Sequence, residues 1–320
     1  MGCNMKRIAF IIPYFGKMNK YTQLWLNSCS FNHTIDWLLF TDDYTAYDYP
    51  SNVKVYYISF EEMKNMVQNS FNFKIELNRP YKLCDYKPAY GLIFKEYLKE
   101  YDFWGFCDKD LIFGDIRSFI TEEILENYVK ILKHGHFTLL RNDVEGNILF
   151  THNVQGCTNY KEVFQSKRSF AFDEWGGLTP ICEKLKIKQY SASIYADVNI
   201  CYSFFQILFH DTGYIPQVFV WENGKLYRYY FFEGKVIRQD FLYIHLQKRA
   251  MEVKLSCEKK LNKYYIGPNS FFIDSSLDIN YESLSRINQF KLYYPAWARL
   301  EFKWKMEERW QEFLGNIRKK

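Results

Sequence analysis

The sequence has 320 residues, of which 48 % are apolar and 25 % are charged, with only 15 Gly and 8 Pro. This composition excludes disordered, collagen-like and linker-dominated chains and indicates a globular protein. The net charge of +5 is small for this length, and the basic residues are interspersed with acidic ones, which argues against a nucleic-acid partner.

Predicted strands and helices alternate over the first third of the chain. Hydrophobic periodicity predicts strands at 7–12, 36–41, 53–60 and 102–107, and helices at 19–28, at 61–69 and from Pro88 onward. This alternation is typical of a mostly parallel sheet with right-handed crossovers. In such sheets the loops at the carboxyl ends of the strands bind ligands. We therefore expect an α/β fold whose N-terminal half binds a nucleotide.

The second half of the chain has a different pattern. A helix is predicted over 122–135, where acidic residues come first and basic residues last, and a strand follows at 137–141. Further on, Asn223-Gly224 separates two apolar runs, which is the strongest local signal of a hairpin. We therefore expect antiparallel strands in the C-terminal half. The sequence has no linker-like stretch within 1–290, which favours one composite domain there.

The most informative segment is Asp108-Lys109-Asp110, which directly follows the buried strand predicted over 102–107. If the strand continues into this segment, its period of two places both carboxylates on one side and Lys109 on the other. The two carboxylates can then share one divalent cation, and their hard oxygens suit Mg²⁺ or Mn²⁺. Such ions usually bind a substrate diphosphate as well, which is the chemistry of a sugar-nucleotide site. Taken alone, an Asp-x-Asp triplet also occurs in ordinary solvated turns.

The context of this triplet resembles the GT-A glycosyltransferases, whose Asp-x-Asp motif ends a strand after several β/α units. More specifically, the chain is similar to an uncharacterised GT-A-like family of bacterial polysaccharide biosynthesis clusters. The matching segments are 11–16, 41–43, 87–90, 108–110, 172–176 and 243–249. The resemblance implies a GT-A fold, a Rossmann-like mostly parallel sheet with helices, in which the nucleotide-sugar half spans about 1–120 and the acceptor half about 121–290.

In this resemblance the loops after the first two strands hold the nucleoside of the donor. The candidate contacts are Pro13, Tyr14, Phe15, Asp42 and Asp43. Carboxylates at the carboxyl end of a strand can accept hydrogen bonds from a ribose or a base. The alternative is that Asp42 and Asp43 only cap and solvate a turn.

Further donor and metal contacts are expected from two later segments. Lys87 and Tyr90 lie one helical turn apart and are candidates for the donor phosphate and its base or sugar, the alternative being an exposed helix start. His245 lies in an alternating strand, where a lone histidine is often a hydrogen-bonded structural group. The resemblance implies instead that His245 is the third metal ligand and that Lys248 or Arg249 stabilises the departing diphosphate.

The segment Asp173-Glu174-Trp175 combines two carboxylates with an aromatic ring and is followed by Gly176-Gly177. Such a loop suits acceptor recognition, because Trp175 can stack on a sugar face while a carboxylate takes the acceptor hydroxyl proton. In an inverting mechanism Asp173 or Glu174 is the base, and Asp197 is a weaker alternative. A retaining mechanism requires no such base. The competing interpretation is an acidic helix cap with a packed Trp175.

The C-terminal segment 291–320 is predicted to be a basic, aromatic amphipathic helix that includes Trp297, Trp304 and Trp310. It has two apolar stripes, one of which can rest on an anionic membrane. The alternative is that both stripes are buried against protein. Since the chain also lacks a predicted membrane span or secretory signal, we expect a cytoplasmic protein, with the inner face of the membrane as a candidate peripheral location.

Together with these patterns, the resemblance implies a metal-dependent glycosyltransferase of the hexosyltransferase class. The expected donor is a nucleotide-sugar, most commonly a UDP-sugar in such folds, and the expected acceptor is a saccharide or lipid-linked saccharide in surface polysaccharide synthesis, such as capsule or O-antigen. One alternative is a non-catalytic carbohydrate-binding protein. The other is an Asp-x-Asp phosphatase, which is disfavoured because Leu111 follows the triplet instead of Thr.

Overall fold

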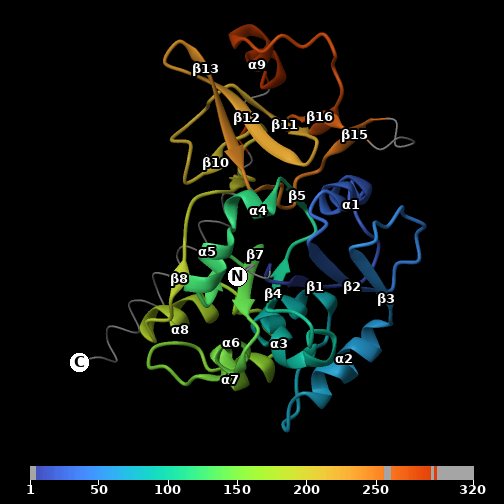
Figure 1. Cartoon of the computed structure of the whole chain (residues 1–320), viewed down its shortest axis with the longest axis vertical. Coiled ribbons are helices and arrows are strands. Elements are labelled where there is room, and N and C mark those ends of the chain that lie inside the picture. The colour runs from blue at the N-terminus through green and yellow to red at the C-terminus, as the bar shows by residue number, and fades with distance from the viewer. Residues whose placement is uncertain (1–4, 256–260, 290–291, 294–320) are drawn as a thin grey trace. The chain divides into compact units, whose positions relative to one another are not determined.

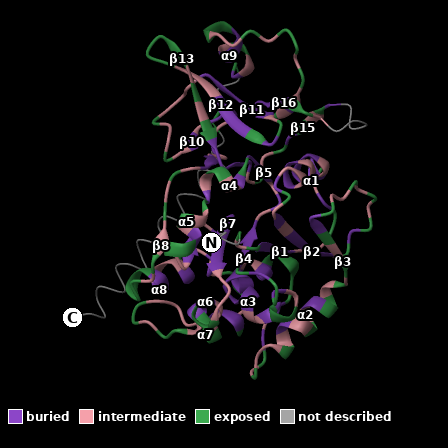
Figure 2. Cartoon of the chain, viewed as in Figure 1, coloured by how far each residue is buried: buried purple, intermediate pink, exposed green. Residues whose placement is uncertain are grey.

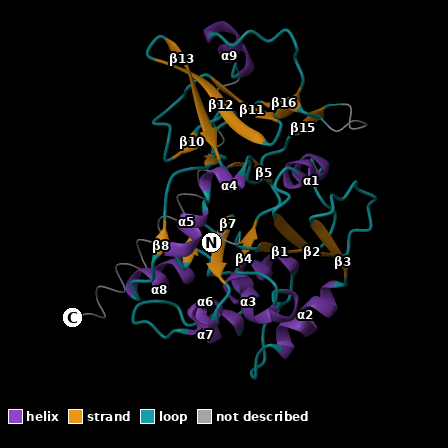
Figure 3. Cartoon of the chain, viewed as in Figure 1, coloured by secondary structure: helices purple, strands orange, loops and turns teal. Residues whose placement is uncertain are grey.

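The computed structural model describes residues 5–255, 261–289 and 292–293. The chain divides into two compact units. The first comprises the chain up to Leu111 together with Asp115–Ala192, and the second comprises Ile112–Gly114 and the chain from Ser193 onward. Figure 3 shows that helices are frequent in the first unit, whereas the second consists mainly of strands and loops.

The first unit is built around a seven-stranded sheet. In spatial order its strands are β3 (Val53–Tyr57), β2 (Ile35–Thr41), β1 (Ile8–Tyr14), β4 (Phe103–Cys107), β7 (Phe137–Arg141), β6 (Lys130–Ile131) and β8 (Gln189–Tyr190). The first four strands are parallel, whereas β7 is antiparallel to both β4 and β6. The predicted α/β class with a mostly parallel sheet is therefore confirmed.

Helices lie on both faces of this sheet. They are α1 (Thr22–Ser30), α2 (Phe60–Asn69), α3 (Tyr90–Ile93), α4 (Ile116–Phe119), α5 (Glu122–Asn127), α6 (Val144–Ile148), α7 (Tyr160–Phe164) and α8 (Leu178–Lys184), with 3-10 turns η1 (Pro80–Ala89), η2 (Lys95–Tyr97) and η3 (Leu149–Thr151). Figure 1 shows α1 on the opposite side of the sheet from α2 and α3. Coverage of both faces explains why β1 and β4 are hydrophobic and buried almost throughout, as Figure 2 shows.

The helix α2 illustrates how sequence and packing agree. Ser59 and Glu62 form a capping box at its start, in which each side chain bonds the backbone N–H of the other residue. The helix then buries Met63 and Val67 in the core cluster that also contains Phe40 of β2. Capping and apolar spacing therefore specify the same helix that was predicted over 61–69.

Two predicted helix boundaries are wrong. The helix predicted over 122–135 ends at Asn127, because the next residues pair as strands: the Val129 N–H donates to the Lys188 carbonyl at 2.9 Å. Pro88 does not begin a helix but lies inside η1, whose 3-10 geometry continues to Ala89. In the first case the cause is the pairing of β6 (Lys130–Ile131) with β8 (Gln189–Tyr190). Both strands have only two residues, so local periodicity does not reveal them.

The second unit contains two further sheets. One has the order β10 (Ile207–Leu208), β9 (Ala196–Val198), β14 (Tyr243–His245) and β5 (Leu111–Phe113), and the other has the order β13 (Lys235–Phe241), β12 (Lys225–Phe232), β11 (Gln217–Glu222), β16 (Lys263–Ile266), β17 (Ser270–Phe272) and β15 (Glu252–Lys254). Helix α9 (Tyr281–Ile287) contacts β11 and β12.

The hairpin predicted in this unit is confirmed. Strands β11 and β12 pair antiparallel, and the turn between them has positive φ at both Asn223 (47°) and Gly224 (78°). Two positive φ angles are the requirement of a type I′ turn, which Asn-Gly meets with little strain. Antiparallel pairing in the C-terminal half is thereby confirmed as well.

None of the helices within the described residues has the length and hydropathy that a membrane span requires. The predicted amphipathic helix over 291–320, with its three tryptophans, falls outside the described residues except for positions 292 and 293.

Candidate functional site

Three parallel strands end side by side at one edge of the first unit's sheet. The register pairs Tyr14 at the end of β1 with Thr41 at the end of β2, and β1 also pairs in parallel with β4. The residues that directly follow these strands are Phe15, Asp42 and Asp108. Chain topology therefore gathers the predicted nucleoside loops and the Asp-x-Asp triplet at one edge, where parallel sheets bind ligands.

The Asp-x-Asp triplet forms a turn and does not extend the strand, because β4 ends at Cys107. The strand alternation that was expected to bring the two carboxylates together is therefore absent. The carboxylates are nevertheless close, because one oxygen of Asp108 and one of Asp110 lie within 4.8 Å of each other. The Asp108 N–H donates to the His136 carbonyl at 3.0 Å, which fixes the start of the turn. Two half-buried carboxylates at this spacing fit a single divalent ion.

Lys87 joins the triplet to the predicted acceptor loop. Its Nζ lies 2.8 Å from Asp108 Oδ1 and 3.1 Å from Asp173 Oδ2, and it donates to the Gly135 carbonyl at 2.8 Å. Burial acts to lower the pKa of Lys87, but the two carboxylates outweigh it and the pKa is raised well above its ordinary value. Lys87 is therefore a permanent cation between two acidic groups.

Asp173 is a buried acid with a raised pKa. Burial raises its pKa to about 7, although the Lys87 cation acts in the opposite direction. The neighbouring Glu174 accepts a hydrogen bond from the Gly135 N–H at 2.6 Å. A side chain at Gly135 would place its Cβ 2.1 Å from Asp173 Oδ2, so this approach requires glycine. Trp175 is 49 % exposed, which suits contact with a ligand.

Gly135 was not identified as a site residue from the sequence. Its contacts to Asp173 and Glu174 span about forty positions in the chain, and no local signal marks them. Lys109 was expected to point to the side opposite the two carboxylates. Its buried Nζ donates to Thr22 Oγ1 at 2.6 Å and lies over the Tyr14 ring. Burial lowers the pKa of Lys109 to about 7, with Asp110 and Asp43 opposing the shift.

Asp42 and Asp43 organise the loop after β1. Asp42 Oδ1 accepts the Gly16 N–H at 2.6 Å, and Asp43 Oδ2 accepts the Met18 N–H at 2.9 Å. Burial alone would raise the pKa of Asp43, but hydrogen bonds from Thr45 and Met18 lower it. Both carboxylates therefore shape the loop that carries Phe15, and Asp42 is the more exposed of the two.

Two of the predicted site residues have their polar groups engaged within their own units. Tyr90 is 2 % exposed within the hydrophobic core, and its hydroxyl donates to the Leu83 carbonyl at 3.1 Å. The guanidinium of Arg249 donates to backbone carbonyls that include Asn199 and Ser203, each at 3.0 Å. Its two terminal NH2 groups are therefore engaged in holding loops of the second unit together, whereas Lys248 is exposed.

His245 belongs to the second unit and has a carboxylate partner there. Strands β9 and β14 are parallel, with His245 in register with Asp197. His245 Nδ1 lies 2.8 Å from Asp197 Oδ1, and Gln247 donates to the same oxygen at 3.0 Å. A carboxylate on Nδ1 fixes the tautomer and directs metal binding to Nε2. Asp197, expected as a weaker alternative base, is therefore placed to orient this histidine.

Several solved structures are similar to parts of this chain. A crystal structure of the galactosyltransferase LgtC in complex with donor and acceptor sugar analogues matches at 11 % identity with a TM-score of 0.29, covering 60 % of this chain and 74 % of LgtC. The glycosyltransferase GlyE of Streptococcus pneumoniae TIGR4 matches at 13 % identity with a TM-score of 0.27, covering 59 % of this chain and 46 % of GlyE.

Matches to sequence families complete these comparisons. No curated protein matches the sequence. The model of a family of unknown function, DUF6625, matches residues 10–275, and the chain therefore belongs to this family.

Proposed function

We propose that this protein is a metal-dependent glycosyltransferase that moves a sugar from a nucleotide-sugar donor to a saccharide acceptor. The observation that carries the proposal is the chain of charges at the carboxyl edge of the parallel strands, in which Lys87 links Asp108 to the buried Asp173. Paired carboxylates recruit a divalent ion, and a buried acid with a pKa near 7 can take a proton at neutral pH. A non-catalytic carbohydrate-binding protein needs neither a metal-binding pair of carboxylates nor a buried acid that accepts a proton.

Asp108 and Asp110 are the proposed metal ligands, with His245 as the third. The carboxylate oxygens of the two aspartates lie close enough together to bind one ion, and hard oxygen donors favour Mg²⁺ or Mn²⁺. His245 is included because of the sequence resemblance, and its Nδ1 lies 2.8 Å from Asp197 Oδ1 within the second unit, which leaves Nε2 as the atom for a metal. When bound, the ion supplies positive charge to the diphosphate of the donor.

The donor nucleoside is proposed to contact the loop after β1 and the acids after β2. Tyr14 and Phe15 offer aromatic surface, Pro13 precedes them in the strand end, and Asp42 offers carboxylate lone pairs to a ribose or base. Lys248, exposed after β14, is the proposed cation for the departing diphosphate.

Asp173 and Glu174 are the candidate bases, and Trp175 is the candidate platform for the acceptor sugar. In an inverting reaction the acceptor oxygen forms a bond to the anomeric carbon, the bond from that carbon to the diphosphate oxygen breaks, and the nucleoside diphosphate leaves with its electron pair. The acceptor hydroxyl proton passes to the carboxylate. Asp173 suits this role better, because its pKa of about 7 lies close to neutral pH.

We further propose that the donor is a UDP-sugar and that the acceptor is a lipid-linked saccharide of a surface polysaccharide, with residues 291–320 contacting the membrane. These assignments rest on the resemblance of the sequence motifs to GT-A enzymes and on the basic, aromatic composition of the tail.

Nucleotide binding tests the proposal. We expect UDP to raise the melting temperature in the presence of Mn²⁺ but not with EDTA, in a comparison with GDP, CMP and ADP. The Asp110→Asn variant should lose this shift. A matched control is Glu145→Gln, which removes one exposed negative charge elsewhere in the first unit and should retain the shift. Absence of any shift for all four nucleotides with Mn²⁺ would contradict the proposal.

A further inference from the structure

A second buried ion pair lies outside the proposed site. Lys82 Nζ is 2.7 Å from Asp85 Oδ2, and the two side chains are 0 % and 1 % exposed. Removing two charges from water is costly, so a buried pair is weak evidence for a contribution to stability by itself. The contacts of the two side chains show instead which part of the backbone the pair holds in place.

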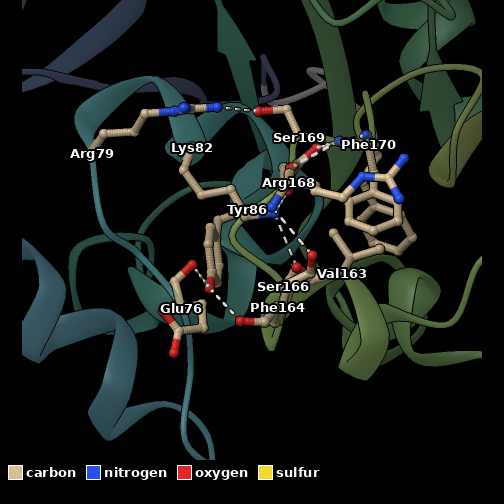
Figure 4. A network of polar contacts seen from close by, with 12 residues as sticks. Glu76, Arg79, Lys82, Tyr86, Val163, Phe164, Ser166, Arg168, Ser169 and Phe170 are labelled. Carbon is tan, nitrogen blue, oxygen red and sulfur yellow. Dashed lines mark hydrogen bonds and ion pairs between the residues drawn. The ribbon is translucent and has the colours of Figure 1, made fainter.

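Both members of the pair hold the end of α7 and the irregular segment that follows it, as Figure 4 shows around Lys82. The ammonium group of Lys82 donates to the carbonyls of Val163, at 3.0 Å, and Arg168. The Asp85 carboxylate accepts the N–H groups of Phe170 and Phe172, at 3.0 and 3.1 Å. The cation therefore satisfies carbonyls and the anion satisfies amides along the same stretch of chain.

The segment depends on such outside partners. Residues 165–177, between α7 and α8, contain no helix or strand. Turns pair some of their backbone groups, such as the Glu174 N–H with the Ala171 carbonyl, and the buried groups that the turns leave over need bonds from elsewhere. Ala171, between the two amides that Asp85 accepts, has a φ of 48°. This left-handed conformation turns neighbouring N–H groups toward one anion, and it is strained for a residue with a Cβ. The pair therefore replaces the hydrogen bonds that regular structure would provide.

The held segment leads directly into the acidic loop of the proposed site. Phe172 is fully buried, its N–H is fixed by Asp85, and its carbonyl accepts the Leu178 N–H at 2.8 Å, where α8 begins. Asp173 follows immediately, and its carboxylate reaches Lys87. The position of the candidate base is thus set by backbone contacts to Asp85, one residue away.

We propose that Lys82 and Asp85 are positioning residues for the transfer reaction: they hold residues 163–172 so that Asp173, Glu174 and Trp175 present a fixed constellation to the acceptor. This inference rests on the proposed function. Neither side chain touches a substrate in this account, because both are fully buried beneath the segment that they hold.

The second unit supplies a matched control. Arg228 and Asp211 also form a buried ion pair, 2.8 Å apart with side chains 3 % and 0 % exposed. Arg228 contacts Gln217 and Gln239 of the neighbouring strands. Lys82→Met and Arg228→Met therefore each break a buried pair, but only the first releases the acidic loop.

The test compares the full-length wild-type protein with Lys82→Met and Arg228→Met at a temperature where all three are folded. For Lys82→Met we expect kcat to fall by roughly 10–100-fold while the KM for the donor stays within about 2-fold, since misplacement of a reacting group by ~1 Å has this order of effect. Hydrogen exchange of the peptide 165–177 should accelerate. Arg228→Met should retain kcat per folded molecule and the exchange rate of this peptide.

The two readouts separate the inference from the function on which it rests. If the wild type consumes no nucleotide-sugar, the proposed function fails, and the exchange of peptide 165–177 still decides whether the pair holds the loop. An unchanged kcat in Lys82→Met, or exchange that accelerates equally in both variants, overturns the positioning role. If Lys82→Met does not fold, Asp85→Asn takes its place, because it removes the charge and replaces one of the two acceptor oxygens that hold Lys82, Phe170 and Phe172 with an NH2 donor; the same outcomes apply.

Discussion

Replacing Lys87 with Met removes the cation that two carboxylates share. Lys87 and Asp173 have side chains only 9 % and 8 % exposed and lie 3.1 Å apart. Methionine fills a similar volume, so the change is mainly one of charge: Asp173 remains in the interior without a counter-ion. Asp108, whose side chain is 36 % exposed, can regain water.

The expected magnitude follows from the burial of the pair. Breaking a buried ion pair by removing one partner costs about 3–5 kcal/mol, whereas the more exposed contact to Asp108 adds at most about 1 kcal/mol. At about 2–4 °C per kcal/mol for a unit of this size, a total of about 3–6 kcal/mol should lower the melting temperature by about 6–24 °C at about pH 9, where Asp173 is ionised in the wild type. Lys133→Met is the control, because the Lys133–Glu183 pair is 36 % and 51 % exposed and should cost at most about 1 kcal/mol.

The destabilisation should depend on pH with a defined sign. The pKa of Asp173 in the folded protein, about 7, already lies above its ordinary value of 3.8, so ionised Asp173 costs stability as the pH rises between these values. Without Lys87 the folded-state pKa rises further, and the extra cost is present only where Asp173 would be ionised. The difference in melting temperature between wild type and Lys87→Met should therefore be larger at pH 8 than at pH 5.

Thermal unfolding of wild type, Lys87→Met and Lys133→Met between pH 5 and pH 9 tests this prediction. A difference in melting temperature below about 2 °C at about pH 9, or one that does not grow with pH, would refute the claim that Lys87 compensates a buried Asp173 carboxylate. A large loss in Lys133→Met would show that lysine removal acts nonspecifically.

Three further changes have defined outcomes. Gly135→Ala should lower transfer by about 10²-fold, since its methyl group displaces Asp173, whereas Gly213→Ala meets open space and should keep wild-type activity and melting temperature. With Asp173 as the base, kcat/KM should rise with pH to a plateau above about 7, because only the carboxylate accepts a proton, and Asp173→Asn should abolish this limb. Asp197→Asn should weaken Mn²⁺ binding about 10–100-fold by calorimetry, because His245 loses its carboxylate partner.

Each of these predictions can fail separately. Full activity in Gly135→Ala would show that the Asp173 position has no role in transfer. A pH profile that is flat between 5 and 9, or one that Asp173→Asn leaves unchanged, would assign the base elsewhere. Unaltered Mn²⁺ affinity in Asp197→Asn would remove His245 from the proposed metal ligands.

The elements that were predicted well are those whose local signals agree with their packing. Strands β1, β2 and β4 are long apolar runs that helices cover, and the hairpin at Asn223-Gly224 has the one dipeptide that suits its turn. The region after residue 122 was misread because β6 pairs with β8, a strand nearly sixty positions later. Local hydrophobic periodicity cannot reveal a pairing partner that is so distant in the sequence.

The candidate site divides in the same way. The acids of the triplet and of the loop at 173–174 could be identified because carboxylates cluster in the sequence. That Lys87 joins them could not be predicted, because its contacts to Asp108 and Asp173 span 21 and 86 positions of the chain. Tyr90 was included for its spacing from Lys87, yet its ring is in the core with its hydroxyl on a carbonyl. The Lys82–Asp85 pair gave no sequence signal of its task, because its partners are backbone groups of a distant segment.

Turnover of a nucleotide-sugar tests the central claim most directly. The measurement is release of nucleoside diphosphate from a panel of UDP-, GDP-, CMP- and ADP-sugars, with Mn²⁺, with Mg²⁺ and with EDTA, by wild type and Asp110→Asn. We expect that one nucleotide class is consumed, that EDTA abolishes the reaction, and that Asp110→Asn lowers the rate by at least about 100-fold, because a metal ligand is lost. Folded wild-type protein that neither binds nor consumes any of these donors with metal present would contradict this claim.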